Sequence, residues 1–121
     1  MIREQVSIDY LKCNHKNDCE LTLDCFDSSV KHWLYSHGSN GIGYVSYADS
    51  GQIWSLEVFT EHRGNNYGRK ILKDFISNSD NNEFKLTPVE DWLVDYYQSI
   101  GFEKTNEYEP ITDFEIMEIK V

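Results

Sequence analysis

The sequence predicts an α+β fold, with helices and a sheet arranged as an α/β three-layer structure. The predicted sheet is mixed and mostly antiparallel, and it contains a central β-α-β unit. Two observations lead to this prediction. Apolar and polar residues alternate along most of the first half, which is typical of half-buried strands. In the second half, apolar residues recur at helical spacing in two stretches that flank a short strand. A strand, a helix and a parallel strand in that order should form a right-handed crossover.

The N-terminal part is predicted to begin with two strands, at residues 2–11 and 19–26, where apolar side chains alternate with polar ones. Residues 29–37 are predicted to form a short helix, because their apolar side chains can share one face and Gly38 can close the last turn. A strand over residues 31–35 is the alternative for this segment.

A hairpin and a helix follow. Residues 42–48 and 52–59 are predicted to pair across Asp-Ser-Gly at 49–51, a favourable turn sequence. Residues 67–76 carry apolar side chains at helical spacing, and the polar residues 78–82 end this helix.

The C-terminal part contains a strand, a helix and a final pair of strands. Residues 84–87 form the short strand, and a helix is predicted to start at Pro88 and to end at Gly101 in a left-handed conformation. Residues 107–108 and 114–121 are predicted to form two antiparallel strands.

Length and composition limit the class of protein. We expect residues 1–121 to form a single domain whose core needs no disulfide or metal. The three cysteines, Cys13, Cys19 and Cys25, are odd in number, which argues against a disulfide framework and favours the reducing cytoplasm. There is no apolar run of about 18 residues, so no membrane span is predicted, and the first residues lack the apolar core of a signal peptide.

The charge of the chain restricts its partners. The 21 acidic residues outnumber the 11 basic ones, which gives a formal net charge of −10. This balance opposes binding to nucleic acid or to an anionic membrane, because phosphate contacts need Lys and Arg. It suits a cationic partner, such as an amine or a basic protein. Solubility alone would explain the charge equally well.

The most informative segment lies between the strand at 52–59 and the helix that follows it. Residues 63–70 read Arg-Gly-Asn-Asn-Tyr-Gly-Arg-Lys. Such a turn leaves several backbone N–H groups pointing at one place, where the helix dipole is positive. The segment therefore predicts an anion site, for which a diphosphate would be a suitable ligand.

Two motifs carry a resemblance to a known family. Residues 63–68, Arg-Gly-Asn-Asn-Tyr-Gly, resemble the acyl-CoA motif of the GNAT superfamily of N-acetyltransferases: Arg or Gln, two residues, Gly, one residue, then Gly or Ala. Residues 97–102, Tyr-Gln-Ser-Ile-Gly-Phe, resemble the second signature of that family, a Tyr on a helix that ends in Gly-Phe. One helix, one strand and one helix separate the two motifs, as the family requires, so the resemblance implies a GNAT-like fold and one acyl-CoA N-acyltransferase-like domain.

The resemblance implies how the co-substrate acetyl-CoA is held. Backbone N–H groups of residues 64–69 would bind the CoA diphosphate, and the main chain near Val58 would pair with the pantetheine amides. The cofactor-binding residues implied in this way are Val58, Arg63, Gly64, Asn65, Asn66, Tyr67, Gly68, Arg69 and Lys70. Asn66 replaces the middle Gly of the motif, and Asn tolerates a positive φ better than other non-Gly residues do.

The resemblance also implies one catalytic residue, Tyr97, and the place of the expected cleft suggests a second, Glu57. Tyr97 would lie near the thioester sulfur, where a protonated phenol can donate a hydrogen bond or a proton to the leaving thiolate. Glu57, on the strand beside the expected cleft, is the best candidate for the general base, and Glu61 and His62 are its competitors. Ordinary structural roles remain open for both catalytic candidates, a core aromatic for Tyr97 and a solvated strand residue for Glu57.

The predicted function is therefore acetyl-CoA-dependent N-acetylation of a primary amine, on a small cationic molecule or a protein, by direct attack on the thioester. The alternative is a noncatalytic GNAT-scaffold protein that acts on a basic partner through its acidic surface. The shortened N-terminal region, with one short helix at 29–37 where the family usually has two, favours the alternative. We expect a monomer or a homodimer. No metal site is predicted, because the cysteine spacing fits no zinc pattern, and Trp33, Trp54 and Trp92 are expected in the core.

Overall fold

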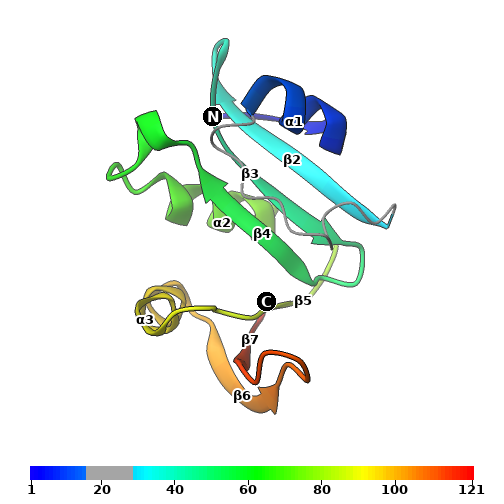
Figure 1. Cartoon of the computed structure of the whole chain (residues 1–121), viewed down its shortest axis with the longest axis vertical. Coiled ribbons are helices and arrows are strands. Elements are labelled where there is room, and N and C mark those ends of the chain that lie inside the picture. The colour runs from blue at the N-terminus through cyan, green and yellow to red at the C-terminus, as the bar shows by residue number, and fades with distance from the viewer. Residues whose placement is uncertain (16–28) are drawn as a thin grey trace.

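Two antiparallel sheets that meet at one edge carry the helices of this protein (Figure 1). The computed structural model describes residues 1–15 and 29–121, apart from the side chains of Cys13 and His15. In chain order the described elements are β1 (Ile2–Val6), α1 (Ile8–His15), β2 (Val30–His37), β3 (Asn40–Ala48), β4 (Ile53–Val58), a 3-10 turn η2 (Thr60–His62), α2 (Tyr67–Ser77), β5 (Glu83–Leu86), α3 (Asp91–Ile100), β6 (Glu103–Tyr108) and β7 (Glu115–Lys120).

The sheet divides between β4 and β5. The first sheet has the order β1-β2-β3-β4 and the second has the order β5-β7-β6, with every paired strand antiparallel. One parallel bridge, between Gln52 and Lys85, joins the two sheets, and the Lys85 N–H donates to the Gly51 carbonyl at 3.1 Å. Beyond this bridge β4 and β5 separate. The predicted mixed, mostly antiparallel sheet with a β4-α2-β5 unit is confirmed.

The helices α1 and α2 lie on opposite faces of the first sheet, which gives the predicted three layers (Figure 1). The larger core is on the α2 side, where Ile71, Leu72, Phe75 and Ile76 of the helix are buried. The smaller core is on the α1 side and consists of Leu11, Leu34, Tyr44 and Phe59. Among residues 1–15 and 29–121, no helix combines the length and the apolar composition that crossing a membrane requires.

The predicted strand at residues 2–11 is correct only as far as Val6. The chain turns at Ser7, whose hydroxyl accepts a hydrogen bond from the Tyr10 N–H at 3.1 Å, and α1 begins at Ile8. A serine cap followed by an acidic first turn, here Asp9, stabilises a helix start. This local signal outweighs the apolar alternation. Among the described residues between β1 and β2, the helix is therefore α1.

The predicted helix at residues 29–37 is wrong, and the strand alternative at 31–35 is right. These residues form β2, which pairs with β1 on one side and β3 on the other. Val30, His32 and Leu34 are buried in alternation, so pairing on both sides decides the conformation of a segment whose local preference is ambiguous. The predicted strand at 19–26 lies outside the described residues.

The second half of the chain largely follows the prediction. The hairpin β3-β4, the helix α2 and the final antiparallel pair β6-β7 are all present. The helix α3 begins at Asp91, three residues after Pro88, and β6 begins four residues earlier than expected, at Glu103. Gly101 ends α3 with a φ of 125°.

Candidate functional site

The loop between η2 and α2 brings main-chain donors to one place. Gly64 has a φ of 83°, and Asn66, the residue that precedes α2, has a φ of 64°. Asn66 stands where the motif has its middle Gly, and it adopts the left-handed conformation expected at that position. The Asn66 side chain makes no capping hydrogen bond at the start of α2, and no acidic residue occupies the first turn of this helix. The first N–H groups of α2 therefore remain available to an anion, at the positive end of the helix dipole.

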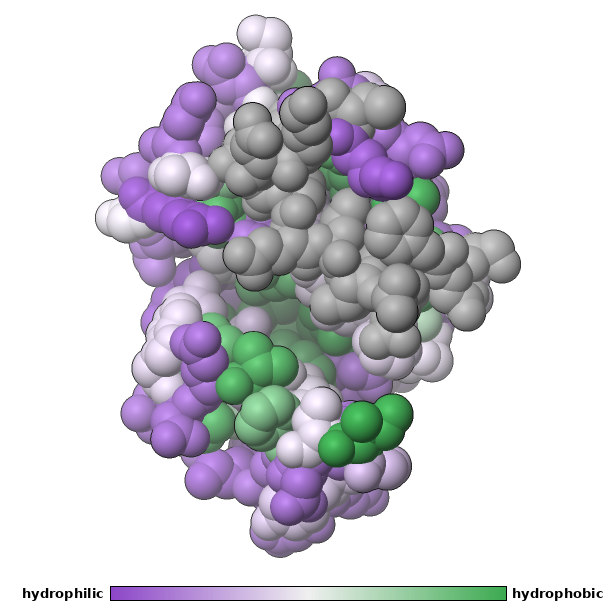
Figure 2. All heavy atoms as spheres, in the orientation of Figure 1, coloured by the Kyte–Doolittle hydropathy of each residue, from purple (hydrophilic) through white to green (hydrophobic). Residues whose placement is uncertain are grey.

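A cleft of about 320 Å³ opens beside this loop, between β4 and α3. Its lining consists of Leu56, Val58, His62, Arg63, Gly64, Asn66, Tyr67, Gly68, Trp92, Leu93, Tyr96 and Tyr97. Figure 2 shows hydrophobic side chains gathered between the half of the molecule that holds the first sheet and the half that holds α3, β6 and β7. The cleft therefore combines an apolar wall with a polar end at the start of α2, which suits a long ligand with an anionic group.

The edge of β4 beside the cleft is open, in that no described strand pairs with it. The Phe59 N–H donates to the Ile42 carbonyl at 2.7 Å, and hydrogen-bonding direction alternates along an antiparallel strand. The N–H and C=O groups of Val58 therefore point away from β3. Arg63 bonds to this edge, because its Nε donates to the Val58 carbonyl at 2.9 Å.

Glu57 points to the other face of the sheet. Side chains alternate along a strand, and its neighbours Leu56 and Val58 pack against the core on the α2 side. The Glu57 carboxylate is 17% exposed and pairs with the Arg63 Nη2 at 3.3 Å. It thus borders β4 on the α1 side, opposite the cleft that Val58 lines.

Tyr97 combines burial with access to the cleft. Its ring makes edge contacts with Tyr96 at 5.4 Å and Phe102 at 5.8 Å and packs against the larger core. Burial, and to a smaller extent the neighbouring Tyr96, raises the pKa of Tyr97 to about 12. The phenol therefore keeps its proton at neutral pH and can act as a hydrogen-bond donor.

Hydrogen bonds and close packing join α2 to α3. Arg69 donates two hydrogen bonds to Ser99, at 2.7 Å to its hydroxyl and at 3.3 Å to its carbonyl. The Tyr96 hydroxyl lies 2.7 Å from the position that a Cβ on Gly68 would occupy. Gly68 thus leaves room for a side chain from α3 at the first turn of α2.

The structure brings most of the predicted site residues together. Val58, Arg63, Gly64, Asn66, Tyr67, Gly68 and Tyr97 line the cleft. Asn65, Arg69, Lys70 and Glu57 are not part of its lining. The Asn65 side-chain amide instead donates to the carbonyls of His62 and Arg63, both at 3.4 Å, and Lys70 lies over the Tyr67 ring at 5.3 Å.

The alternatives for the general base lie in η2. Glu61 is exposed, and the ring of His62 packs edge-on against Tyr67 at 6.1 Å and lines the cleft. Among the three candidates, Glu57 alone lies on the strand that borders the cleft.

Two tryptophans do not lie where the sequence suggests. Trp54 is 42% exposed and Trp92 is 62% exposed, so the prediction of core positions is wrong for both, whereas Trp33 does pack against the core. Trp92 and Tyr96 line the cleft with Leu93, one turn of α3 apart. The sequence shows this face as a single apolar stripe, and nothing in the spacing separates cleft residues from core residues.

No metal centre is found within the described part of the chain, where no three His, Cys, Asp or Glu side chains are grouped closely enough to hold an ion. The side chains of Cys13, His15, Cys19 and Cys25 lie outside the described residues.

The family model for the acetyltransferase (GNAT) domain matches residues 13–113. No curated protein matches the chain in sequence.

Solved acetyltransferases share the fold. The IAA acetyltransferase from Bacillus cereus has a TM-score of 0.72 at 11% identity, with 99% of each chain covered. The ribosomal-protein-S18-alanine N-acetyltransferase from Escherichia coli has a TM-score of 0.69 at 13% identity and covers 99% of this chain and 94% of its own. Mutant forms of the spermidine/spermine N-acetyltransferase from Vibrio cholerae have a TM-score of 0.66 at 14% identity, with coverages of 98% and 93%. At these sequence identities the similarity shows a shared fold and nothing more.

Proposed function

This chain belongs to the GNAT acetyltransferase family, which uses acetyl-CoA, and on that premise we propose that it transfers the acetyl group to the primary amine of a cationic acceptor. The acceptor is a small amine or an amino group of a protein. The observation that supports this proposal best is the uncapped start of α2 beside the open edge of β4. Together they offer donors for a diphosphate and a strand edge for an extended amide chain.

The proposed fit divides acetyl-CoA between two parts of the cleft. The N–H groups at the start of α2 bind the diphosphate, and the exposed side chains of Arg63 and Lys70 add positive potential. The pantetheine amides pair with the open edge at Val58. Because Arg63 occupies the Val58 carbonyl in this structure, its guanidinium has to leave that carbonyl when a pantetheine amide donates to it.

The proposed reaction is a direct acyl transfer. The amine nitrogen bonds to the thioester carbonyl carbon, the C–S bond breaks, and its electron pair leaves with sulfur as a thiolate. Tyr97 donates a hydrogen bond to that sulfur from the cleft. Glu57 takes the proton of the incoming ammonium from the α1 side of β4, directly or through water. The second proton of the nitrogen passes to water or to the departing thiolate as the amide forms.

Acetyl-CoA is expected to stabilise the folded protein. A ligand that binds only the native state adds about 2.7 kcal/mol to the free energy of unfolding at about 100 times its dissociation constant. A thermal shift titration measures the effect, with acetate and inorganic phosphate as controls that lack the nucleotide. An unchanged melting temperature at millimolar acetyl-CoA would falsify the proposal.

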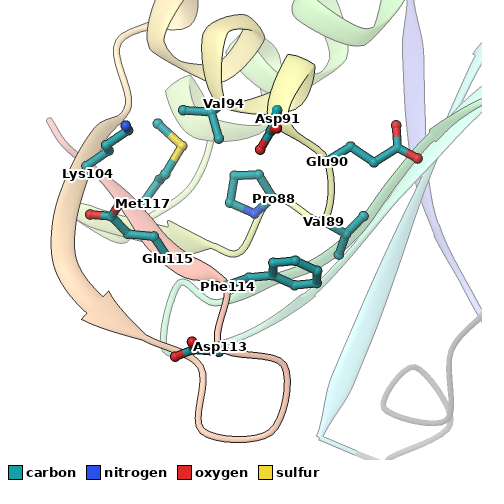
Figure 3. Close-up of a pocket in the computed structure, with 10 residues that line it drawn as sticks. All are labelled: Pro88, Val89, Glu90, Asp91, Val94, Lys104, Asp113, Phe114, Glu115 and Met117. Carbon is teal, nitrogen blue, oxygen red and sulfur yellow. The ribbon is translucent and has the colours of Figure 1, made fainter.

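The charge around the start of α3 favours a cationic acceptor. A second pocket, of about 210 Å³, lies at the start of α3 and shares no lining residue with the cleft (Figure 3). Four acidic residues, Glu90, Asp91, Asp113 and Glu115, line it with one basic residue, Lys104, and the Glu90 carboxylate points away from the pocket (Figure 3). Together with the net charge of −10, they make this end of the molecule negative.

We therefore expect cationic amines to be acetylated in preference to acidic amino acids. The apparent second-order rate constant should fall as salt rises from about 20 to about 200 mM, because exposed charges are screened over roughly 10 Å at 0.1 M. A panel of amines with detection of released thiol measures both effects. A preference for anionic acceptors contradicts the electrostatic argument. Binding of acetyl-CoA without turnover on any amine would favour the noncatalytic alternative.

A further inference from the structure

We propose that Tyr96 is a cofactor-binding residue, whose hydroxyl donates a hydrogen bond from α3 to the diphosphate of acetyl-CoA. This inference rests on the proposed function, because it names a further residue of the same site. It gives the two neighbouring tyrosines of α3 separate roles, Tyr97 at the sulfur and Tyr96 at the phosphates.

The Tyr96 hydroxyl lies close to the start of α2. It lies 2.7 Å from the place of a Cβ on Gly68, the second residue of α2. The next nearest atom to that place is the Cγ2 of Val58, at 3.7 Å. The Tyr96 hydroxyl thus reaches the first turn of α2, where the main-chain donors of the anion site lie.

The surroundings of Tyr96 hold the ring in place. Its ring contacts those of Trp92 at 6.4 Å and Tyr97 at 5.4 Å. The Ser99 hydroxyl donates to the Tyr96 carbonyl at 2.6 Å and accepts a hydrogen bond from Arg69 at 2.7 Å. The first turn of α2 and the last turn of α3 are therefore joined around this side chain, so the hydroxyl is placed before any ligand arrives. Preorganised donors of this kind bind anions at a small entropic cost.

The chemistry of the hydroxyl suits a phosphate oxygen. It has no hydrogen-bond partner among the described residues, while it lines the cleft with Gly64, Asn66 and Gly68. Burial raises the pKa of Tyr96 and the Arg69 charge opposes the rise, so the group is a protonated donor at neutral pH. A donor that faces the start of a helix has an anion as its complementary partner.

Tyr96→Phe tests the hydrogen bond. It should raise the dissociation constant of acetyl-CoA about 10-fold, since hydrogen bonds to charged groups are the stronger ones. Titration calorimetry should show the same factor for 3′-phospho-ADP, which keeps the diphosphate. It should show no change for S-acetyl-pantetheine, which lacks the diphosphate. Tyr108→Phe, on an exposed tyrosine of β6, is the matched control and should leave all three affinities unchanged.

Gly68→Ala tests the geometry without a ligand. Its Cβ would lie 2.7 Å from the Tyr96 hydroxyl, so the melting temperature should fall. Adding Tyr96→Phe removes the oxygen and leaves ordinary contacts of 3.7 and 3.8 Å, so the double variant should recover the melting temperature but not the affinity for acetyl-CoA.

The outcomes separate this inference from the proposed function. Failure of the unaltered protein to bind acetyl-CoA overturns both. Binding by the unaltered protein with equal affinity in Tyr96→Phe overturns the role of Tyr96 alone. Equal losses for acetyl-CoA and S-acetyl-pantetheine would make Tyr96 a packing residue and would also overturn it.

Discussion

Tyr97→Phe is expected to lower the rate of acetyl transfer by roughly 10- to 1,000-fold, because it removes a hydrogen bond to the charge that develops on sulfur in the transition state. The substitution keeps the ring that contacts Phe102 and Tyr96 and removes only the hydroxyl. Stability and the affinity for acetyl-CoA should therefore change little. The loss belongs to the transition state, in which negative charge develops on sulfur.

The pKa of Tyr97 decides what the hydroxyl does. Burial raises this pKa to about 12, and a thiol has an ordinary pKa of about 8.5. The phenol is thus a weaker acid than the thiol it assists, so it stabilises the thiolate through a hydrogen bond and keeps its own proton. The alkaline side of the pH–rate profile below about pH 10 should consequently be the same in the Phe variant, only lower.

Single-turnover kinetics, which isolate the chemical step, measure this effect. Tyr108→Phe serves as the exposed control and should retain full turnover. An unchanged chemical rate in Tyr97→Phe would leave Tyr97 as a core aromatic only.

The sequence predicts the second half of the fold well because its signals are local and agree. The turn at 49–51, the strong helical periodicity of α2 and the glycine after α3 each specify the element that the structure contains. The replacement of a motif glycine by Asn66 is also interpretable, since the residue type predicts the left-handed conformation that is observed.

The N-terminal part is harder to predict, because strand pairing and a single helix cap determine its secondary structure. β2 lies between two strands, and no local pattern reveals that its partners are β1 and β3. Ser7 is an ordinary polar residue in an alternating stretch until its hydroxyl caps α1. Competition between such local hydrogen bonds and strand pairing cannot be read from alternation alone.

The candidate site is likewise predictable from the sequence only in part. Residues contributed by the loop, such as Arg63 and Gly64, follow from a contiguous motif. Residues contributed by α3 depend on how that helix is rotated against β4, which the apolar stripe does not fix. For this reason the sequence does not distinguish Tyr96 and Trp92 from core residues, although both line the cleft.

Gly43→Ala is expected to have the largest effect on the fold near the site. Gly43 is buried in β3 opposite Val58. An added Cβ would lie 2.3 Å from the Glu57 carbonyl oxygen, 3.2 Å from the Val58 Cα and 3.0 Å from the Ile71 Cδ1. Two of these atoms are backbone, so β4 has to move. Overpacking of this kind lowers the free energy of unfolding by about 1–3 kcal/mol.

The movement of β4 should also weaken the binding of acetyl-CoA, because it displaces the residues that orient Glu57 and the open edge at Val58. Gly38→Ala is the matched control: its Cβ has no atom within 4 Å, and its φ of 57° costs only the left-handed strain of a non-glycine residue, about 1 kcal/mol. Chemical denaturation gives the two stabilities, and calorimetry at a temperature where both variants are folded gives the acetyl-CoA affinities. We expect both variants to lose stability and Gly43→Ala alone to lose affinity. If Gly43→Ala bound acetyl-CoA as tightly as Gly38→Ala does, the position of β4 at Val58 would not matter for the cofactor, and the assignment of this edge to the pantetheine would have to be abandoned.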